Sequence, residues 1–208
     1  MGKKSLLICG GLVFVHLFLL FNLSFTAWPE MLAWPFFILR GWVPYKDFAI
    51  VHTPLLVLDL AIFNKIFGIG AVQLKIYGWI LIALTDLTLF YVVKRLWSVK
   101  TALYSLLFFI PLQILYDGNG IWFDYALSIW GLLALYLLLT KRYLAAGAVW
   151  ALAFFTKQTA VWFLFPVFFA LYGKRPSEYY FNYLIPTVVL AIAFGIDSLL
   201  LSPRANLK

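Results

Sequence analysis

The stretch that decides the fold is RGWVPYKDFAIVHTPLLVLDLAIFNKIFG, residues 40–68. It follows an apolar run at 5–27 and precedes another at 74–93, yet it carries Arg40, Lys46, Asp47, His52, Asp59 and Lys65. A charged side chain at the centre of a bilayer costs about 3 kcal/mol or more. The stretch therefore raises the question of whether its apolar part, 53–69, crosses a membrane or lies at the membrane surface.

The composition indicates an integral membrane protein. The chain has 208 residues, of which 65% are hydrophobic and 12% charged, whereas soluble domains are about half apolar and about a quarter charged. Aromatic residues make up 20%, including nine Trp, and aromatic rings favour the water–lipid interface. The net charge of +8 comes from short basic groups between apolar runs. That pattern is typical of membrane orientation signals and speaks against a nucleic-acid partner.

The positions of the basic residues predict the topology. Candidate spans are 5–27, 74–93, 101–116, 122–140, 143–158, 159–173 and 180–202, separated by basic residues at 94, 95, 100, 141, 142, 174 and 175. If 53–69 does not cross, all of these basic residues share the cytoplasmic side with Lys3 and Lys4, as the positive-inside rule requires. We therefore expect an all-α, multi-pass protein of the cell membrane with about seven transmembrane helices and a cytoplasmic N-terminus. Its long first external loop, 28–73, should contain interfacial helices.

This topology places candidate site residues on one external face. The first loop carries the acids Glu30 and Asp47, and a second external loop, 115–125, carries Asp117 and Asp124. The basic residues Arg40, Lys46 and Lys157 lie on the same side and are candidates for binding a lipid phosphate. A carboxylate can act as a general base and a cation can stabilise a departing phosphate. A divalent metal ion on Asp117, Asp124 and Glu30 is an alternative that the spacing does not require.

Two motifs carry a family resemblance. GWVPYKDFAIVHTPLLVLDLAIFNKIFG, residues 41–68, and AGAVWALAFFTKQTAVWFLFP, residues 146–166, resemble the signatures of C-class polytopic membrane glycosyltransferases. The closest group is the protein-mannosyltransferase-like and rhizobial lipopolysaccharide glycosyltransferase-like enzymes. The resemblance implies transfer of a sugar from a polyprenyl-phosphate donor to a saccharide, lipid or protein acceptor outside the membrane, with Glu30 as general base. It also implies that residues 1–208 form one membrane domain, the N-terminal module of a longer enzyme, without a certain cofactor.

Each candidate also has a structural interpretation. Asp47 can cap a nearby helix and hold Lys46 or Arg40 in place, and Asp117 and Asn119 are good turn and N-cap residues for the span at 122–140. Asp86 lies in the middle of a span, where we expect it to be protonated or paired, with His16 or with Thr85 and Thr88 as partners. The alternative functions are a small carrier or lipid-handling protein that uses Asp86, and an inactive fragment that lacks its C-terminal half.

Overall fold

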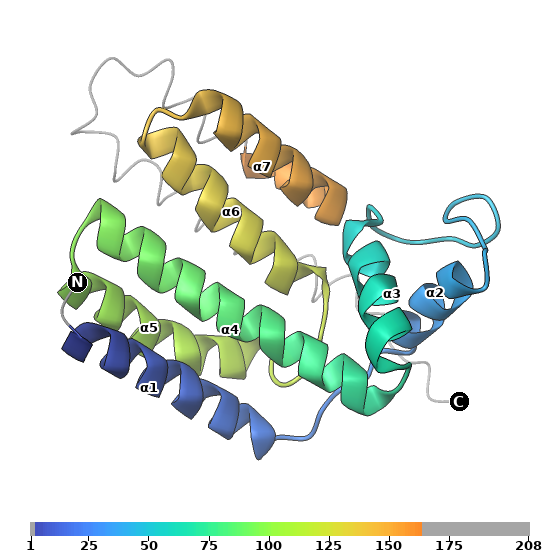
Figure 1. Ribbon diagram of the computed structural model, residues 1–208, viewed down its shortest axis with the longest axis horizontal. Helices are drawn as coiled ribbons and strands as arrows, with labels where there is room; N and C mark the ends of the chain where they lie inside the picture. The colour runs from blue at the N-terminus through green and yellow to red at the C-terminus, as the bar shows by residue number, and fades with distance from the viewer. Residues whose placement is uncertain (1–2, 164–208) are drawn as a thin grey trace, which may run out of the picture. The chain divides into compact units, whose positions relative to one another are not determined.

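The computed structural model describes residues 3–163, and within this range it contains helices and no β-strand (Figure 1). Seven α-helices are followed by one 3₁₀ helix: α1 Lys3–Phe21, α2 Pro29–Leu39, α3 Leu55–Phe67, α4 Ala71–Leu96, α5 Val99–Tyr116, α6 Phe123–Leu139, α7 Tyr143–Thr156 and η1 Gln158–Phe163. The α-helices belong to one compact unit, Met1–Val161. The expected all-α class is confirmed for the described residues.

Three helices, α1, α4 and α5, are long and apolar enough to cross a membrane. The predicted spans 122–140 and 143–158 correspond to α6 and α7, which have 17 and 14 residues. At about 1.5 Å per residue these two helices are shorter than a ~30 Å hydrocarbon core. Of the predicted span 159–173 only the start is described, within η1, and 180–202 lies outside the described residues. Three candidate spans are thus supported, and the number seven stays a prediction.

The surface of the helices differs from that of a water-soluble protein. Large apolar side chains point outward, and Leu7, Phe108 and Leu144 are 74%, 72% and 92% exposed. His16 and Asp86, in contrast, are fully buried. In water such an exposed apolar surface would be unfavourable, whereas in lipid it is the polar groups that must find partners inside the protein. The chain is therefore a membrane-associated protein.

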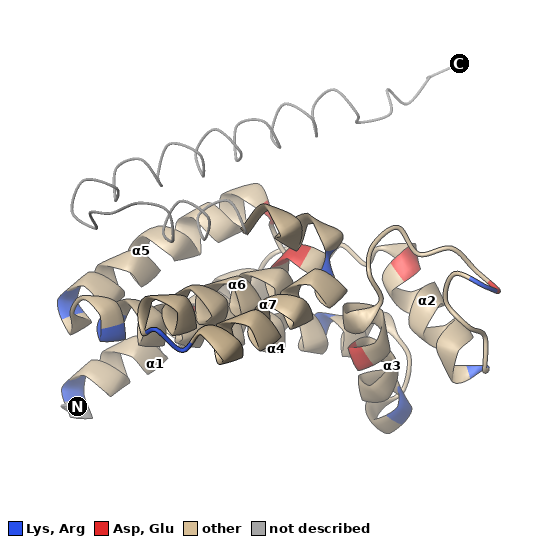
Figure 2. Ribbon diagram, turned by 90° about the horizontal axis from the view of Figure 1, so that it is seen from above, with Lys and Arg blue, Asp and Glu red and all other residues tan. Residues whose placement is uncertain are grey.

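Helix α4 is the centre of the bundle and contacts α1, α5 and α6 (Figure 1). Successive helices of the bundle run in opposite directions, so helix ends that are distant in sequence meet. The end of α4 carries Lys94 and Arg95, and Lys141 and Arg142 separate α6 from α7. These basic groups gather at the end of the bundle where α1 begins (Figure 2). We call the opposite end, where α5 ends and α6 begins, the acidic end.

The stretch 40–68 folds into a turn and a short helix at the acidic end (Figure 1). Helix α3 has 13 residues, about 20 Å, which is too short to cross a ~30 Å core. It packs against α2 and α4. The shared core includes Met31, Leu56, Leu60, Leu74 and Phe123, all nearly fully buried. The long connection between α1 and α4 is thus a packed layer with two helices in it.

Helix α1 ends earlier than the predicted span 5–27, at Phe21. The side-chain amide of Asn119, almost a hundred residues later, donates to the carbonyls of Leu20 at 2.7 Å and Leu23 at 2.9 Å. A carbonyl that is satisfied by such a side chain does not need the next turn of helix. The partner that satisfies these carbonyls is distant in sequence, and residues 22–27, in which apolar and polar residues alternate, do not by themselves mark the end of the helix.

Candidate functional site

Three separate segments meet at the acidic end: residues 51–53, the start of α6 and the junction between α7 and η1. The hydroxyl of Thr53 donates to the Phe154 carbonyl at 2.6 Å, and the amide nitrogen of Gln158 donates to the Val51 carbonyl at 3.1 Å. The ring of His52 packs edge-on against Phe123, with centroids 4.7 Å apart. These contacts hold the three segments together. We call the group His52, Asp117, Asp124, Lys157 and Gln158 the acidic-end cluster.

The tautomer of His52 follows from its contact with Gln158. The Val51 carbonyl can only accept, so the NH₂ group of Gln158 faces Val51 and its oxygen faces His52. The His52 Nδ1 atom, 3.1 Å from that oxygen, must then carry a proton. Burial and the nearby charge of Lys157 lower the pKa of His52. His52 is therefore neutral at pH 7, and its Nε2 atom, which has no hydrogen bond to a described residue, is free to accept a proton.

Lys157 and Asp124 form the ion pair of the cluster. The Nζ atom of Lys157 donates to both carboxylate oxygens of Asp124, at 2.7 and 2.9 Å. Asp124 is in the first turn of α6, where the helix dipole favours a negative charge. The lysine side chain is 13% exposed and the aspartate 53%. Water therefore reaches Asp124 and can solvate its carboxylate if the largely buried ammonium group binds another anion instead.

Asp117 is the second carboxyl group of the cluster. It is the C-cap residue of α5. Burial and the negative charge of Asp124 raise its pKa, while Lys157 partly opposes this shift. Two carboxyl groups thus lie within electrostatic range of a lysine, and Asp117 holds its proton more tightly than an aspartic acid in water does. This pattern is typical of sites that transfer protons.

Asn119 anchors the loop between α5 and α6 to α1 and α4. Besides its hydrogen bonds to the carbonyls of Leu20 and Leu23, the side chain of Asn119 accepts from the indole nitrogen of Trp79 at 3.1 Å. The backbone carbonyl of Asn119 accepts from the Thr26 amide at 2.8 Å. A Cβ atom on Gly120 would lie 3.4 Å from the Thr26 carbonyl oxygen, so the two segments are close to van der Waals contact here. The N-cap interpretation of Asp117 and Asn119 is wrong, because the N-cap of α6 is Trp122. The two residues form the turn instead.

Glu30 is in the first turn of α2 and is exposed. It forms no ion pair or hydrogen bond with any described residue. One helical turn later on the same face, Trp34 packs against Trp122 and Phe123, with centroids 6.5 and 6.3 Å apart. The ring of His52 packs against the same two residues. Glu30 therefore projects on the side of α2 that faces the cluster, although the structure records no contact between them.

The remaining candidates of the first loop lie apart from the cluster. Asp47 accepts from the Val43 amide at 2.7 Å inside a tight turn, and since α3 begins at Leu55 with Pro54 as its N-cap, Asp47 does not cap a helix. It forms no ion pair with Arg40 or Lys46 in the described part of the chain. Arg40 lies over the Phe36 ring, 5.1 Å from its centroid. The hydrogen bond within the turn therefore gives Asp47 a structural role.

Residues 3–163 contain no set of side chains that could bind a metal ion. There, no group of three or more His, Cys, Asp or Glu side chains is arranged so that it could hold a metal ion. Asp117, Asp124 and Glu30 are accordingly not gathered as a set of metal ligands.

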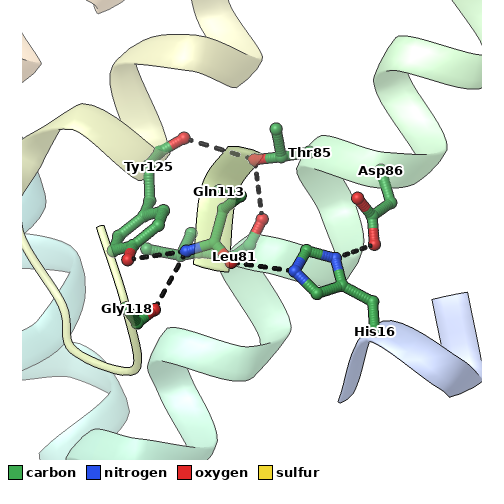
Figure 3. A network of polar contacts seen from close by, with 7 residues as sticks. All are labelled: His16, Leu81, Thr85, Asp86, Gln113, Gly118 and Tyr125. Carbon is green, nitrogen blue, oxygen red and sulfur yellow. Dashed lines mark hydrogen bonds and ion pairs between the residues drawn. The ribbon is translucent and has the colours of Figure 1, made fainter. Parts of the chain in front are cut away.

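A second polar group lies inside the bundle (Figure 3). Nδ1 of His16 is 2.9 Å from Oδ2 of Asp86, and Nε2 of His16 is 2.8 Å from Oε1 of Gln113. This confirms the predicted pairing of Asp86 with His16. Thr85, the other predicted partner, bonds the Leu81 carbonyl at 2.9 Å instead.

Two residues of the cluster, His52 and Gln158, were not among the site residues expected from sequence. His52 lies next to Thr53 and Gln158 lies next to Lys157, each inside one of the two quoted motifs. Their position in these motifs was the sequence signal that could have identified them. Of the expected residues, the structure brings together Asp117, Asp124 and Lys157, and it leaves Arg40, Lys46 and Asp47 outside their contacts. Comparisons of the chain with protein-family models, with curated proteins and with solved structures find no match.

Proposed function

We propose that the protein is a membrane glycosyltransferase, or the N-terminal module of one, that moves a sugar from a polyprenyl-phosphate carrier to an external acceptor. The observation that carries the proposal is the acidic-end cluster. Its carboxyl groups, lysine and neutral histidine come from four segments and meet beside apolar helices. A reaction between a lipid-linked phosphate and a water-soluble acceptor needs acid–base groups and a cation at such a boundary.

The proposed topology has about seven spans, a cytoplasmic N-terminus and an external acidic end. Support comes from the basic groups at the end of α4 and between α6 and α7, which gather at the opposite end of the bundle (Figure 2). The shortness of α3 is also consistent with this topology, because a helix of 13 residues fits a surface position. A donor lipid in the outer leaflet would then present its phosphate at the level of the cluster.

The proposed chemistry is a direct displacement at the anomeric carbon. The acceptor oxygen forms a bond to C1 of the sugar while the bond from C1 to the phosphate oxygen breaks, and the electron pair leaves with the polyprenyl phosphate. The acceptor proton moves to a base. Glu30 is the base that the family resemblance implies, and Nε2 of His52 is the alternative that the geometry adds. Lys157 would leave Asp124 to bind the phosphate, whose negative charge increases as the bond to C1 breaks.

The lipid-phosphate part can be tested without knowing the sugar. The reconstituted chain should bind polyprenyl phosphate more tightly than the uncharged polyprenol of equal length, and Lys157→Gln should lower the affinity for the phosphate roughly tenfold. Lys75→Gln is a matched control at the same end of the bundle, since Lys75 stacks on Trp79 at 4.8 Å and lies outside the cluster. Equal binding of polyprenol and polyprenyl phosphate would refute the proposal.

The base can be identified in the same system once a sugar donor is found. Glu30→Gln should abolish transfer and leave phosphate binding intact, because the residue acts on the acceptor. If transfer survives in Glu30→Gln and is lost in His52→Asn, the base is His52. Asp59→Asn is the control for removing a carboxyl group on α3. Full transfer in both site variants would exclude this mechanism.

The carrier alternative receives no support from a specific observation. His16 and Asp86 are fully buried and bonded to one another. A pathway through the protein would need these groups to reach water on one side.

A further inference from the structure

A chain of hydrogen bonds leads from the middle of the bundle to the loop between α5 and α6 (Figure 3). It starts at Asp86 on α4, passes through His16 on α1 and reaches Gln113 on α5. The amide nitrogen of Gln113 then donates to the Gly118 carbonyl at 3.1 Å and to the Tyr125 hydroxyl at 3.0 Å. The chain therefore joins three helices to the loop that carries Asp117 and to the first turn of α6, which carries Asp124.

The direction of these bonds follows from the last acceptor. The Gly118 carbonyl can only accept, so the NH₂ group of Gln113 must face it and the oxygen of Gln113 must face His16. Nε2 of His16, 2.8 Å from that oxygen, must therefore carry a proton. A single proton then remains to be placed between Nδ1 of His16 and Oδ2 of Asp86.

That proton has two possible positions, and the other carboxyl oxygen decides between them. On Nδ1 it makes an imidazolium–carboxylate ion pair, and on Oδ2 it makes a neutral imidazole and a neutral carboxylic acid. Oδ1 of Asp86 is buried and has no hydrogen-bond partner within the described residues. Leaving the oxygen of an ionised carboxylate unpaired in an apolar interior costs far more than leaving a neutral carbonyl oxygen unpaired.

We propose that Asp86 is held as a neutral acid that donates to neutral His16, and that this pair fixes Gln113 and so positions the loop carrying Asp117 and the first turn of α6 carrying Asp124. Each group in the chain has one role. Asp86 donates to His16, His16 donates to Gln113, and Gln113 donates to the loop. Reversing either link at Gln113 would leave two donors or two acceptors facing each other. Moving the proton from Asp86 to His16 would instead leave a buried, ionised carboxylate with one oxygen unpaired. The inference rests on this geometry and not on the proposed sugar transfer.

The protonation of Asp86 can be read by infrared spectroscopy. The wild-type protein at neutral pH should show the carbonyl stretching band of a carboxylic acid, which a carboxylate lacks. Labelling aspartate with ¹³C in its carboxyl group should shift this band, and Asp86→Asn should remove it. Absence of an acid band, or an acid band of unchanged shape and intensity in Asp86→Asn, overturns the neutral pair.

The positioning role can be read by hydrogen exchange, measured by mass spectrometry on the peptide that covers residues 117–122. Gln113→Met removes the two donors at similar size and should increase exchange of these amides at least severalfold. Asp86→Asn keeps a neutral donor towards His16 and should leave their exchange close to that of the wild type. Ser105→Ala on α5, which has no contact with the chain of hydrogen bonds, is the matched control.

The outcomes separate the two halves of the proposal. Unchanged exchange in a folded Gln113→Met overturns the positioning role. Should Gln113→Met not fold, His16→Asn gives the same test, since it breaks the chain one step earlier. Exchange in Asp86→Asn as high as in the Gln113 variant would mean that the pair needs an ionised carboxylate, and this overturns the neutral pair.

Discussion

Two acid–base pairs in the described part of the chain lie at different depths. Asp86 and His16 are fully buried among apolar helices, whereas Asp124 is 53% exposed and pairs with Lys157 at the acidic end. Both pairs have short contacts, of 2.9 and 2.7 Å. The difference lies in the environment: charge separation is expensive in the interior, and it is cheap where water reaches the carboxylate. We infer that the interior pair serves structure and that the acidic-end pair is free to exchange partners.

The largest effect should come from breaking the interior pair. Asp86→Leu leaves Nδ1 of His16 buried without a partner, and we expect the free energy of unfolding to fall by about 2–3 kcal/mol. His16→Leu should cost a similar amount. The double variant should be more stable than the sum of the two losses predicts, because it removes both polar groups together. Thermal unfolding in detergent micelles measures all three, and strictly additive losses would contradict the coupling.

A smaller effect should come from breaking the exposed pair. Asp124→Asn removes a carboxylate from an ion pair open to solvent, and we expect a loss of about 0.5 kcal/mol in the free energy of unfolding. Added salt screens the ion pair, so it should lower the free energy of unfolding of the wild type towards that of the variant. A loss comparable to that of Asp86→Leu would show that the pair is essential for folding. It would then not be available for a ligand.

The smallest of the three effects should be an increase in the free energy of unfolding, not a loss. Folding raises the pKa of Asp117, so the folded protein binds this proton more tightly than the unfolded chain. Its stability must then fall as the pH rises from the ordinary carboxyl range, near about 4, through the raised pKa. Asp117→Asn should remove this part of the pH dependence and stabilise the protein by about a few tenths of a kcal/mol at neutral pH. Unfolding measured between acidic and neutral pH tests the sign, and a variant less stable than wild type at neutral pH would contradict it.

The sequence predicted the helices well because apolar runs and basic breaks between them are local features. The runs at 74–93, 101–116 and 122–140 correspond to α4, α5 and α6, and the charged stretch 40–68 folds into a turn and a short helix. The end of α1 was not predictable, since Asn119 supplies the partner. The same applies to Asp47, whose turn closes by a hydrogen bond to the Val43 backbone.

By itself, the sequence determined that the chain is helical and apolar and that its acids stand apart from its basic pairs, because hydropathy and charge depend on composition and order. The tertiary structure decided which of these residues meet. His52, Asp124 and Lys157 are separated by long stretches of chain and come together only because α6 and α7 pack side by side and the turn before α3 docks on them. Hydrogen bonds and ion pairs act over a few ångströms in space, and no local pattern in a sequence records that distance.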